Sequence, residues 1–549
     1  MVRGRRLPIL AAGAVLAAAA ACALALASGG RGASAQTPKP GALTFVVSGR
    51  GWGHGVGLSQ WGAYGFAREG ATFDEILAHY YQGTTLGPAP VSRVRVLLAQ
   101  GRRRLTVSSV QPFRVRDGAG VTHDLVAGSH TFGPGLRLKV GNALQARPLP
   151  GPLLFLPGST PLRLDRPYRG QLLVSVANGR LRAVNNVGLE LYLWGVVPSE
   201  VPFDWPAEAL KAQAVAARTY ALAVRKSGSY FDLYPDVRSQ VYRGVAGEKP
   251  STTAAVQATA GKVVLYNGQI AKTYFFSTSG GRTATVTDVW PSSDPVPYLV
   301  SVDDPYDTAS PHHQWGPFTV KASRLVRALR VPGRLLDVRL SITASARVKS
   351  VTAVGSGGEV TVSGADVRRA LGLRSTWFRI GLLSLTPPTA PATYNLPAAL
   401  TGVARGMGTV SLEQRVRAGA WQTVGRVTPA RDGTVTVSTR PRETAEYRLA
   451  SGKAKSGVVA LPVAPLVRFY GMVDASTLRG YARPVLAGAS VLVQRLDGTA
   501  WRPVVRATID ANGDFLARLD LTPGTYRARL APGRGFVPGV SPPFRVGPA

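Results

Sequence analysis

The sequence predicts an α+β protein in which a mixed N-terminal module precedes two small all-β sandwiches of the immunoglobulin or fibronectin III type. Three observations lead to this prediction: short alternating strands throughout, one long alanine-rich helix pattern, and an internal repeat near the C-terminus. We expect a signal peptide over residues 1–35, the module over 42–385, a Pro-rich linker over 386–393, and the repeats over 394–465 and 466–549.

The N-terminal segment has the layout of a secretory signal peptide. Arg3, Arg5 and Arg6 precede an apolar run, and small residues offer a cleavage site just before Gln36. The chain's single cysteine, Cys22, lies in this run, so the mature chain would have no thiol for a disulfide, a zinc site or catalysis. A lipoprotein modified at Cys22 and an uncleaved membrane anchor are alternatives. We therefore expect a secreted or cell-envelope protein.

The chain is strongly basic, with 65 Lys and Arg against 30 Asp and Glu and a formal net charge of +35. An exported basic protein points to an anionic polymer outside the membrane, such as a bacterial cell wall. Nucleic acid is the competing interpretation of the charge, and the export signal argues against it. Basic residues form a run only at Arg102-Arg103-Arg104, where a hairpin tip is expected.

The elements of the module follow from its periodicity. Strands are predicted at 91–98, 105–107, 136–140, 172–176, 181–185, 262–266 and 270–277. Asn178-Gly179 marks a hairpin turn between two of them. Pro206 suits the first position of a helix, and apolar residues then recur at helical spacing from Leu210 to Val224.

The two C-terminal repeats align residue by residue. Trp421 aligns with Trp501 and Asp432-Gly433 with Asn512-Gly513, an offset of 80 residues. Both copies also end on a Tyr-Arg pair. We expect spacer domains with the two tryptophans at equivalent buried positions and no part in catalysis, while weak binding to wall or protein stays open.

One carboxylate stands out in the module. Glu200 lies between the pairs Val197-Pro198 and Val201-Pro202, just before the predicted helix. Apolar neighbours desolvate a carboxylate and raise its pKa, which suits a general acid at neutral pH. The prolines restrict the backbone on either side, which suits a side chain that must be aimed. A surface glutamate in a turn before a helix is the alternative.

Two further segments carry groups that can bind a ligand. Glycines alternate with Trp52 and His54 over residues 49–63, which leaves space for a bulky ligand, and indole faces suit sugar rings. Hydroxyl residues at 277–279 follow a strand and precede a Gly-Gly turn, where they can bind carbonyls or sugar hydroxyls. Each segment alone is also typical of an ordinary turn, with His54 hydrogen-bonded to the backbone.

Together these segments resemble the SpoIID/LytB family, named for the stage II sporulation protein D and the amidase enhancer LytB. The matching strings are GRGWGHGVGLSQWGAYGFA, VVPSEVPFDWPAEALKAQAVAARTYAL, SQVYRGV and FFSTSGGRT, and the resemblance covers about residues 43–385. In the family, the glycine-histidine segment and the HYYQGT segment (79–84) usually close the domain, whereas here they open it. The sequence looks circularly permuted, so we expect residues 49–86 to dock beside the LGLRST segment, 371–376.

The resemblance implies a peptidoglycan lytic transglycosylase, which cleaves the β-1,4 bond between N-acetylmuramic acid and N-acetylglucosamine and leaves a 1,6-anhydromuramyl end. The family's catalytic glutamate corresponds to Glu200, which would act first as acid and then as base, whereas a hydrolase normally needs two carboxyl groups. Asp204 and Glu208 look like helix-start residues. The expected substrate-binding residues are Trp52, His54, Ser59, Gln60, Lys211, Gln213, Arg218, Tyr220, Ser277, Thr278, Ser279 and Gly280.

No cofactor and no metal are expected. Some family members hold zinc partly through cysteines, which the mature chain lacks, and the adjacent His312 and His313 would face opposite ways on an extended chain. The expected partners are peptidoglycan glycan strands and an N-acetylmuramoyl-L-alanine amidase, in wall remodelling or sporulation. The alternative function is a non-catalytic, wall-binding amidase enhancer, and a purely structural envelope protein is a third class.

Overall fold

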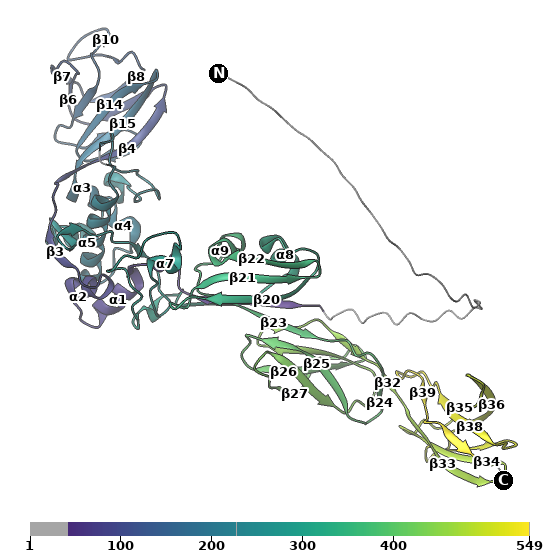
Figure 1. Cartoon of the computed structure of the whole chain (residues 1–549). Coiled ribbons are helices and arrows are strands. Elements are labelled where there is room, and N and C mark those ends of the chain that lie inside the picture. The colour runs from purple at the N-terminus through teal and green to yellow at the C-terminus, as the bar shows by residue number, and fades with distance from the viewer. Residues whose placement is uncertain (1–41, 227, 548–549) are drawn as a thin grey trace, which may run out of the picture. The chain divides into compact units, whose positions relative to one another are not determined.

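The computed structural model describes residues 42–226 and 228–547 (Figure 1). The signal peptide predicted at 1–35, with Cys22, lies outside these residues. Within the described residues, the fold mixes helices and strands and consists mostly of sheets, as an α+β assignment requires. None of the helices in these ranges is long and apolar enough to cross a membrane.

A two-sheet β-domain is built from residues 93–188, with strand orders β4-β15-β14-β11-β6-β7 and β13-β12-β5-β8. Phe113, Phe132 and Phe155 are buried together in its core. The bounds are β4 Arg93–Arg102, β5 Leu105–Ser109, β6 Phe113–Arg116, β7 Thr122–Leu125, β8 Gly128–Phe132, β11 Leu153–Leu156, β12 Leu162–Arg163, β13 Pro167–Tyr168, β14 Gln171–Ala177 and β15 Arg180–Gly188.

The predicted hairpin and strands of this domain are present, with one shortening. Asn178 and Gly179 have φ angles of 49° and 66° in the turn between β14 and β15, as a tight hairpin requires. The strand predicted at 136–140 is reduced to β9 Arg137–Leu138, which pairs with β10 Arg147–Pro148.

A helical layer is built from segments that come before and after the β-domain in the chain. Pro206 is the N-cap of α5 rather than its first residue, so the helix begins one residue later than predicted. The strand predicted at 270–277 is interrupted, because β17 and β18 occupy only its two ends. The bounds are α1 Gln60–Arg68, α2 Phe73–Tyr80, α3 Leu189–Trp194, α4 Val197–Glu200, α5 Ala207–Val224, α6 Pro250–Ala258 and α7 Val286–Val289, with β2 Leu58–Ser59, β3 Thr85–Pro88, β16 Lys262–Tyr266, β17 Gln269–Ile270 and β18 Phe275–Phe276.

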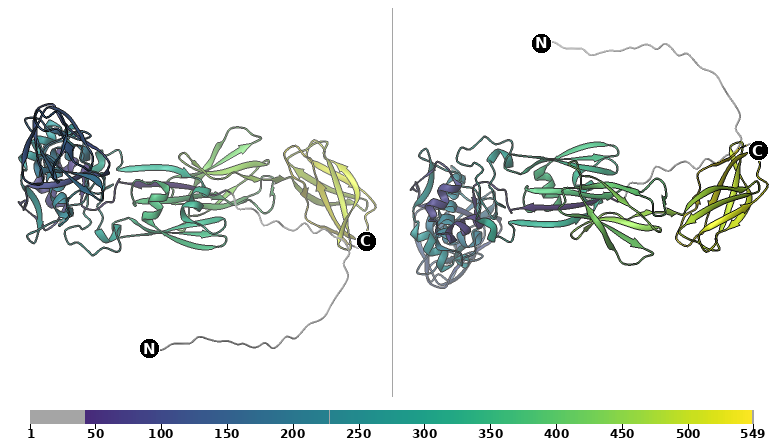
Figure 2. Two further views of the ribbon diagram at one scale, coloured as in Figure 1. Left: turned by 90° about the horizontal axis from the view of Figure 1, so that it is seen from above. Right: turned by 90° about the horizontal axis from the view of Figure 1, so that it is seen from below.

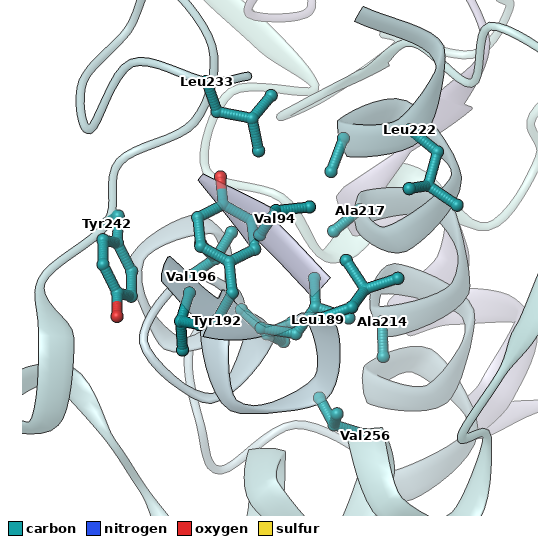
Figure 3. Close-up of a cluster of buried hydrophobic side chains, with 14 of the residues drawn as sticks. Val94, Leu189, Tyr192, Val196, Ala214, Ala217, Leu222, Leu233, Tyr242 and Val256 are labelled. Carbon is teal, nitrogen blue, oxygen red and sulfur yellow. The ribbon is translucent and has the colours of Figure 1, made fainter. Parts of the chain in front are cut away.

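Helix α5 is the centre of this layer. On one side, Ala214 and Ala217 pack toward Tyr192 and Leu189 of α3 (Figure 3). On the other side, Ala212, Val215 and Ala216 join the apolar cluster that also holds residues of α1 and α2. The many alanines therefore allow close approach on both sides, where the sequence indicated one apolar stripe.

The strand that opens the described chain is central in a five-stranded sheet with the order β19-β1-β23-β25-β28. β1 pairs antiparallel with both β19 and β23. Helices α8 and α9 and the hairpins of β20, β21 and β22 share one apolar core with these strands. The bounds are β1 Thr44–Arg50, β19 Gln314–Val320, α8 Ala322–Leu329, β20 Leu335–Ile342, β21 Val348–Gly355, β22 Gly358–Ser363, α9 Gly364–Leu371 and β23 Phe378–Leu385.

The two repeats have matching strand orders. Sheet β27-β26-β29-β30 of the first corresponds to β36-β35-β38-β39 of the second, and β25-β28 corresponds to β34-β37. The second repeat, coloured yellow, is seen from two further sides in Figure 2. The bounds are β24 Ala392–Thr393, β25 Ala398–Arg405, β26 Val410–Val416, β27 Gln422–Val427, β28 Thr434–Thr439, β29 Ala445–Ser451, β30 Ala454–Lys455, β31 Val459–Leu461, β32 Val463–Ala464, β33 Leu466–Asp474, β34 Thr477–Arg483, β35 Ser490–Asp497, β36 Ala500–Thr508, β37 Asp514–Arg518, β38 Gly524–Leu530, β39 Gly539–Val540 and β40 Phe544–Val546.

The tryptophans of the repeats are equivalent but not buried in the cores. Trp421 and Trp501 are half-buried, and each lies under the arginine of its own Tyr-Arg pair, with distances from the guanidinium carbon to the ring centroid of 4.0 Å for Arg448 and 4.3 Å for Arg527. The prediction of buried positions is wrong, because these indoles stack on cations at the sheet surface. The core aromatic of each pair is instead the tyrosine.

The Pro-rich stretch 386–393 does not separate two independent cores. β23 ends at Leu385 and pairs directly with β25, and β24 pairs with β32. Val46, Leu383 and Leu385 belong to the same buried cluster as the core of the first repeat. A cut after residue 390 would therefore expose apolar side chains of β1 and β23.

Candidate active site

Glu200 is the last residue of α4, at the point where the chain turns away in extended conformation. Its neighbours Val197 and Val201 are buried in the apolar cluster around α3 and α5. Burial raises the pKa of Glu200 from 4.5 to about 7, and a hydrogen bond from the backbone N–H of Val241 opposes this rise. The carboxyl group is therefore partly protonated at neutral pH, as its apolar sequence neighbours predicted.

Two tyrosines lie near enough to this carboxyl group for its charge to affect them. The negative charge of Glu200 contributes to raised pKa values of Tyr192 and Tyr220, after burial as the main cause. The hydroxyl of Tyr192 donates to Gln240 (3.1 Å), whose amide donates to the carbonyl of Ala217 in α5 (3.1 Å). These contacts hold the segment SQVYRGV in place, so that Val241, which follows Gln240, can direct its N–H at Glu200.

His54 is held by the backbone rather than directed at a ligand. The N–H of Val56 donates to Nδ1 (3.1 Å), so the proton is on Nε2, which donates to the carbonyl of Phe275 (3.1 Å). Burial lowers the pKa of His54 to about 4, and the ring is neutral at physiological pH. The expectation that His54 contacts substrate is wrong, because its ring nitrogens are occupied by the backbone of Val56 in the same segment and of Phe275 in β18.

Aromatic rings nevertheless connect His54 with the surroundings of Glu200. The centroid of His54 lies 5.8 Å from that of Tyr274, which lies 5.9 Å from that of Tyr220. The glycine-histidine segment also pairs with the hydroxyl segment, since Trp52 and Thr278 exchange backbone hydrogen bonds of 2.8 and 3.0 Å. The three segments that the sequence singled out therefore come together, as predicted.

The hydroxyl segment is organised by a carboxylate that the sequence analysis missed. Asp307, fully buried, accepts hydrogen bonds from the hydroxyl of Ser279 (2.9 Å) and the N–H of Gly280 (2.5 Å), and contacts His313 Nδ1 (2.6 Å). Nearby, the hydroxyl of Tyr80 donates to Asp304 (2.9 Å), and burial raises the pKa of Asp304 to about 7. The signal for both acids was the aspartate-rich string DDPYDTASPHH.

Several predicted substrate contacts are instead buried parts of the scaffold. Ser59 accepts from the N–H groups of Gly62 and Ser279, each at 3.2 Å. Arg218 forms an ion pair with Glu190 and donates to two backbone carbonyls. Because all of them are buried, we correct this assignment for Ser59, Gln60, Gln213, Arg218, Thr278, Ser279 and Gly280.

The remaining predicted contacts keep accessible surface. Trp52 is 45% exposed, with the ring of His312 at its edge (4.6 Å) and the guanidinium of Arg374 at 5.4 Å. Tyr220 and Ser277 are half-buried. Lys211 is also half-buried and forms an ion pair with Glu208 (2.6 Å).

The predicted role of Glu208 at the helix start is confirmed, because it lies in the first turn of α5. It also accepts from the N–H of Phe73 at the start of α2 (2.8 Å). Asp204 is exposed in the turn between α4 and α5.

An aromatic cluster beside Glu200 was not predicted. Trp61 and Tyr64 of α1 meet Trp205, five residues after Glu200, with ring centroids 5.0 to 5.3 Å apart. All three rings are half-buried, and Phe203 in the same turn is 50% exposed. Indole and phenol faces at this place can stack on sugar rings.

Within residues 42–226 and 228–547, no three His, Cys, Asp or Glu side chains are grouped so that they could hold a metal ion.

The glycine-histidine segment docks where the permutation requires. The N–H of Arg50 donates to the carbonyl of Trp377 (2.9 Å), and that of Gly53 to Arg374 (3.1 Å), beside the LGLRST segment. Thr44 at the start of β1 lies opposite Leu383 near the end of β23, so a short hairpin could join these ends in an unpermuted chain. The docking is confirmed, whereas the permutation itself stays a prediction.

The stretch of chain around Glu200 matches a known family model. Residues 177–266, which include Glu200 and α5, match the family model described as SpoIID, stage II sporulation protein. This part of the chain is therefore similar to the SpoIID/LytB family.

The relatives include proteins under both family names. Stage II sporulation protein D of Bacillus subtilis (strain 168) is 34% identical over 222 residues, 36% of this chain and 61% of that protein. Its namesake in Bacillus amyloliquefaciens is 32% identical over 221 residues, with the same coverage. The amidase enhancer of Bacillus subtilis (strain 168) is 44% identical over 116 residues, 21% of this chain and 15% of that protein. The chain thus spans less than two thirds of the length of these relatives.

Among solved structures, the human OSCAR ligand-binding domain aligns with 30% of this chain and 96% of its own length. With 14% identity and a TM-score of 0.13, this likeness carries no argument about fold or function.

Proposed function

We propose that the chain acts on the bacterial cell wall as a peptidoglycan lytic transglycosylase, with Glu200 as its acid and base. The names of its relatives place such proteins in sporulation or in the enhancement of an amidase. The observation that supports transglycosylase chemistry is the half-buried carboxyl group of Glu200, which lies among apolar side chains at the end of α4 and has a pKa of about 7. We also propose that it works outside the cytoplasm, where its substrate lies.

The reaction needs one carboxyl group used twice. Protonated Glu200 gives its proton to the glycosidic oxygen while the bond from that oxygen to C1 of N-acetylmuramic acid breaks. The resulting carboxylate then takes the proton of the muramyl 6-hydroxyl as this oxygen attacks C1, which closes the 1,6-anhydro ring. Glu200 ends the cycle protonated, and no water is consumed.

Neighbouring groups support these steps. The N–H of Val241 stabilises the carboxylate formed after the first proton transfer. Exposed Trp52 and the cluster of Trp61, Tyr64 and Trp205 offer aromatic faces on which successive sugar rings can stack.

The test is cleavage of intact and peptide-stripped glycan strands, with anhydromuramyl ends as the readout. Glu200→Gln keeps the shape and removes the transferable proton, so the rate should fall by at least about two orders of magnitude while glycan binding persists. Asp204→Asn, at an exposed carboxylate in the next turn, is the matched control and should cleave normally. Unchanged cleavage by Glu200→Gln would refute the assignment.

The second candidate function is a wall-binding amidase enhancer without its own chemistry, favoured by the 44% identity to a protein of that name. Both candidates require glycan binding, and the transglycosylase alone requires an ionisable Glu200. Stimulation of an N-acetylmuramoyl-L-alanine amidase that survives Glu200→Gln, together with no anhydromuramyl ends from the unsubstituted chain, would favour the enhancer.

A further inference from the structure

The second repeat carries a basic depression on the outer face of its sheet β36-β35-β38-β39. It encloses about 270 Å³ and is lined by Ala489, Ser490, Leu492, Arg506, Arg529, Ala531, Pro532 and Arg534. Among these described lining residues none is acidic and none is aromatic. Three guanidinium groups and one hydroxyl therefore give the depression its polar character.

Strand register brings two of the arginines into one row. Leu492 of β35 lies opposite Arg506 of β36 on one side and opposite Arg529 of β38 on the other. Side chains of directly opposed residues share a face of the sheet, and neighbouring strands are about 4.8 Å apart, so the two arginines flank Leu492 about 10 Å from each other at Cα. Arg534, in the loop after β38, lines the same depression.

These three arginines differ from others in the same repeat. Arg479 pairs with Asp514 (2.8 Å), Arg502 pairs with Asp497 (2.6 Å), and Arg527 donates to the amide oxygen of Gln494 (2.8 Å). Across the described part of the chain, by contrast, the guanidinium groups of the depression have neither an ion pair nor a hydrogen bond. Unpaired guanidinium groups that converge on one concave place are suited to a ligand with anionic oxygens.

The first repeat lacks this arrangement. There, Ser411 of β26 lies opposite Arg426 of β27 and Ala450 of β29, so alanine stands where the second repeat has Arg529. The depression is therefore specific to the second repeat and is not a general result of the sandwich fold.

We propose that this depression binds phosphodiester groups of a polyol-phosphate polymer of the cell envelope. Guanidinium forks match the geometry of phosphate oxygens, and the space is several times the roughly 30 Å³ that one water takes in the liquid, which leaves room for a phosphate with its flanking polyol. A single-stranded nucleic acid would need aromatic side chains for its bases, which this lining lacks. The inference does not depend on catalysis at Glu200, because the depression lies wholly within the second repeat.

The test measures binding of chain 40–549 to fluorescently labelled poly(glycerol phosphate) by anisotropy at about 0.15 M salt. The double variant Arg506→Ala/Arg529→Ala should weaken binding about tenfold or more. The control Arg426→Ala/Arg431→Ala removes the same charge from exposed arginines of the first repeat and should change binding less than twofold. Unaltered circular dichroism of both variants shows that the sheets remain folded.

Three results would overturn the proposal. Equal loss in both double variants would mean that net charge alone attracts the polymer. No measurable binding by the unsubstituted chain would mean that the depression does not hold phosphodiesters. A DNA duplex with the same number of phosphates that competes equally well, and loses affinity in the same variant, would assign the depression to nucleic acid instead.

Discussion

Glu200→Gln should make the protein more stable at alkaline pH while it removes the proposed activity. A carboxyl group whose pKa rises from 4.5 to about 7 on folding is favoured in its protonated form by the fold, so its ionisation opposes folding. The full difference corresponds to about 3 kcal/mol. Because Glu200 keeps part of its surface exposed, we expect a gain of about 1–3 kcal/mol.

The pH dependence has a definite sign. Below about pH 4.5, glutamate is neutral in both the folded and the unfolded chain, and the variant should match the unsubstituted protein. The stability of the unsubstituted protein then falls as the pH rises from 4.5 to about 7, whereas that of the variant has no such contribution. The difference should therefore grow over this window and stay constant above it.

Hydrogen exchange of peptides from α3 and α5 is a suitable assay, because it reports the local stability of the helices that surround Glu200 in a chain with several cores. Unsubstituted protein and variant are compared at the same pH, once near 5 and once near 8, with Asp204→Asn as the control. Equal protection of the two proteins at pH 8, or a difference in protection that does not change with pH, would contradict the conclusion that ionisation of Glu200 destabilises the fold.

Three further results are expected. His54→Phe keeps an aromatic ring but leaves the N–H of Val56 and the carbonyl of Phe275 without these partners. Thermal denaturation should show that the free energy of unfolding falls by about 1–3 kcal/mol for each of the two groups. The loss should not vary between pH 6 and 8, since the pKa of His54 is about 4. Arg218→Met leaves the carboxylate that it pairs with uncompensated and should cost about 3 kcal/mol in the same assay, and a neutral outcome would contradict the ion pair. The chain 40–465 should stay soluble and cleave soluble glycan strands at an unchanged rate. The chain 40–390 should aggregate, because its truncation uncovers β23. Loss of cleavage by a folded 40–465 chain would show that the second repeat takes part in the site.

Local patterns in the sequence predicted which segments lie together around Glu200. The apolar frame of Glu200 and the alternating glycines are short-range features, and the structure brings the segments that carry them together. The turn at Asn178-Gly179 was predictable for the same reason, because positive φ angles are a local requirement.

Long-range features account for what could not be predicted. Arg218 is of a residue type that often binds ligands. Its burial and its ion pair with Glu190, which is distant in the sequence, become apparent only in the structure. Asp307 acts on Ser279 through a hydrogen bond across 28 residues, and no local pattern marks the two as partners. The pairing of β23 with β25 in one sheet was missed for a related reason. A proline-rich stretch between two strands has the same sequence pattern whether or not the two strands pair with each other.

The central position of β1 sets the order in which this site can form. β1 is synthesised before the rest of the described chain, yet the hydroxyl of Ser375 that holds the carbonyl of Arg50 follows it by 325 residues. The neighbours β19 and β23 also come late, so the glycine-histidine segment stays without its supports until most of the module has left the ribosome. Glu200 and α5 are made long before that point. An incomplete chain would thus carry Glu200 without the glycine-histidine segment in place, and the proposed cleavage of glycan would begin only when β23 has joined the sheet.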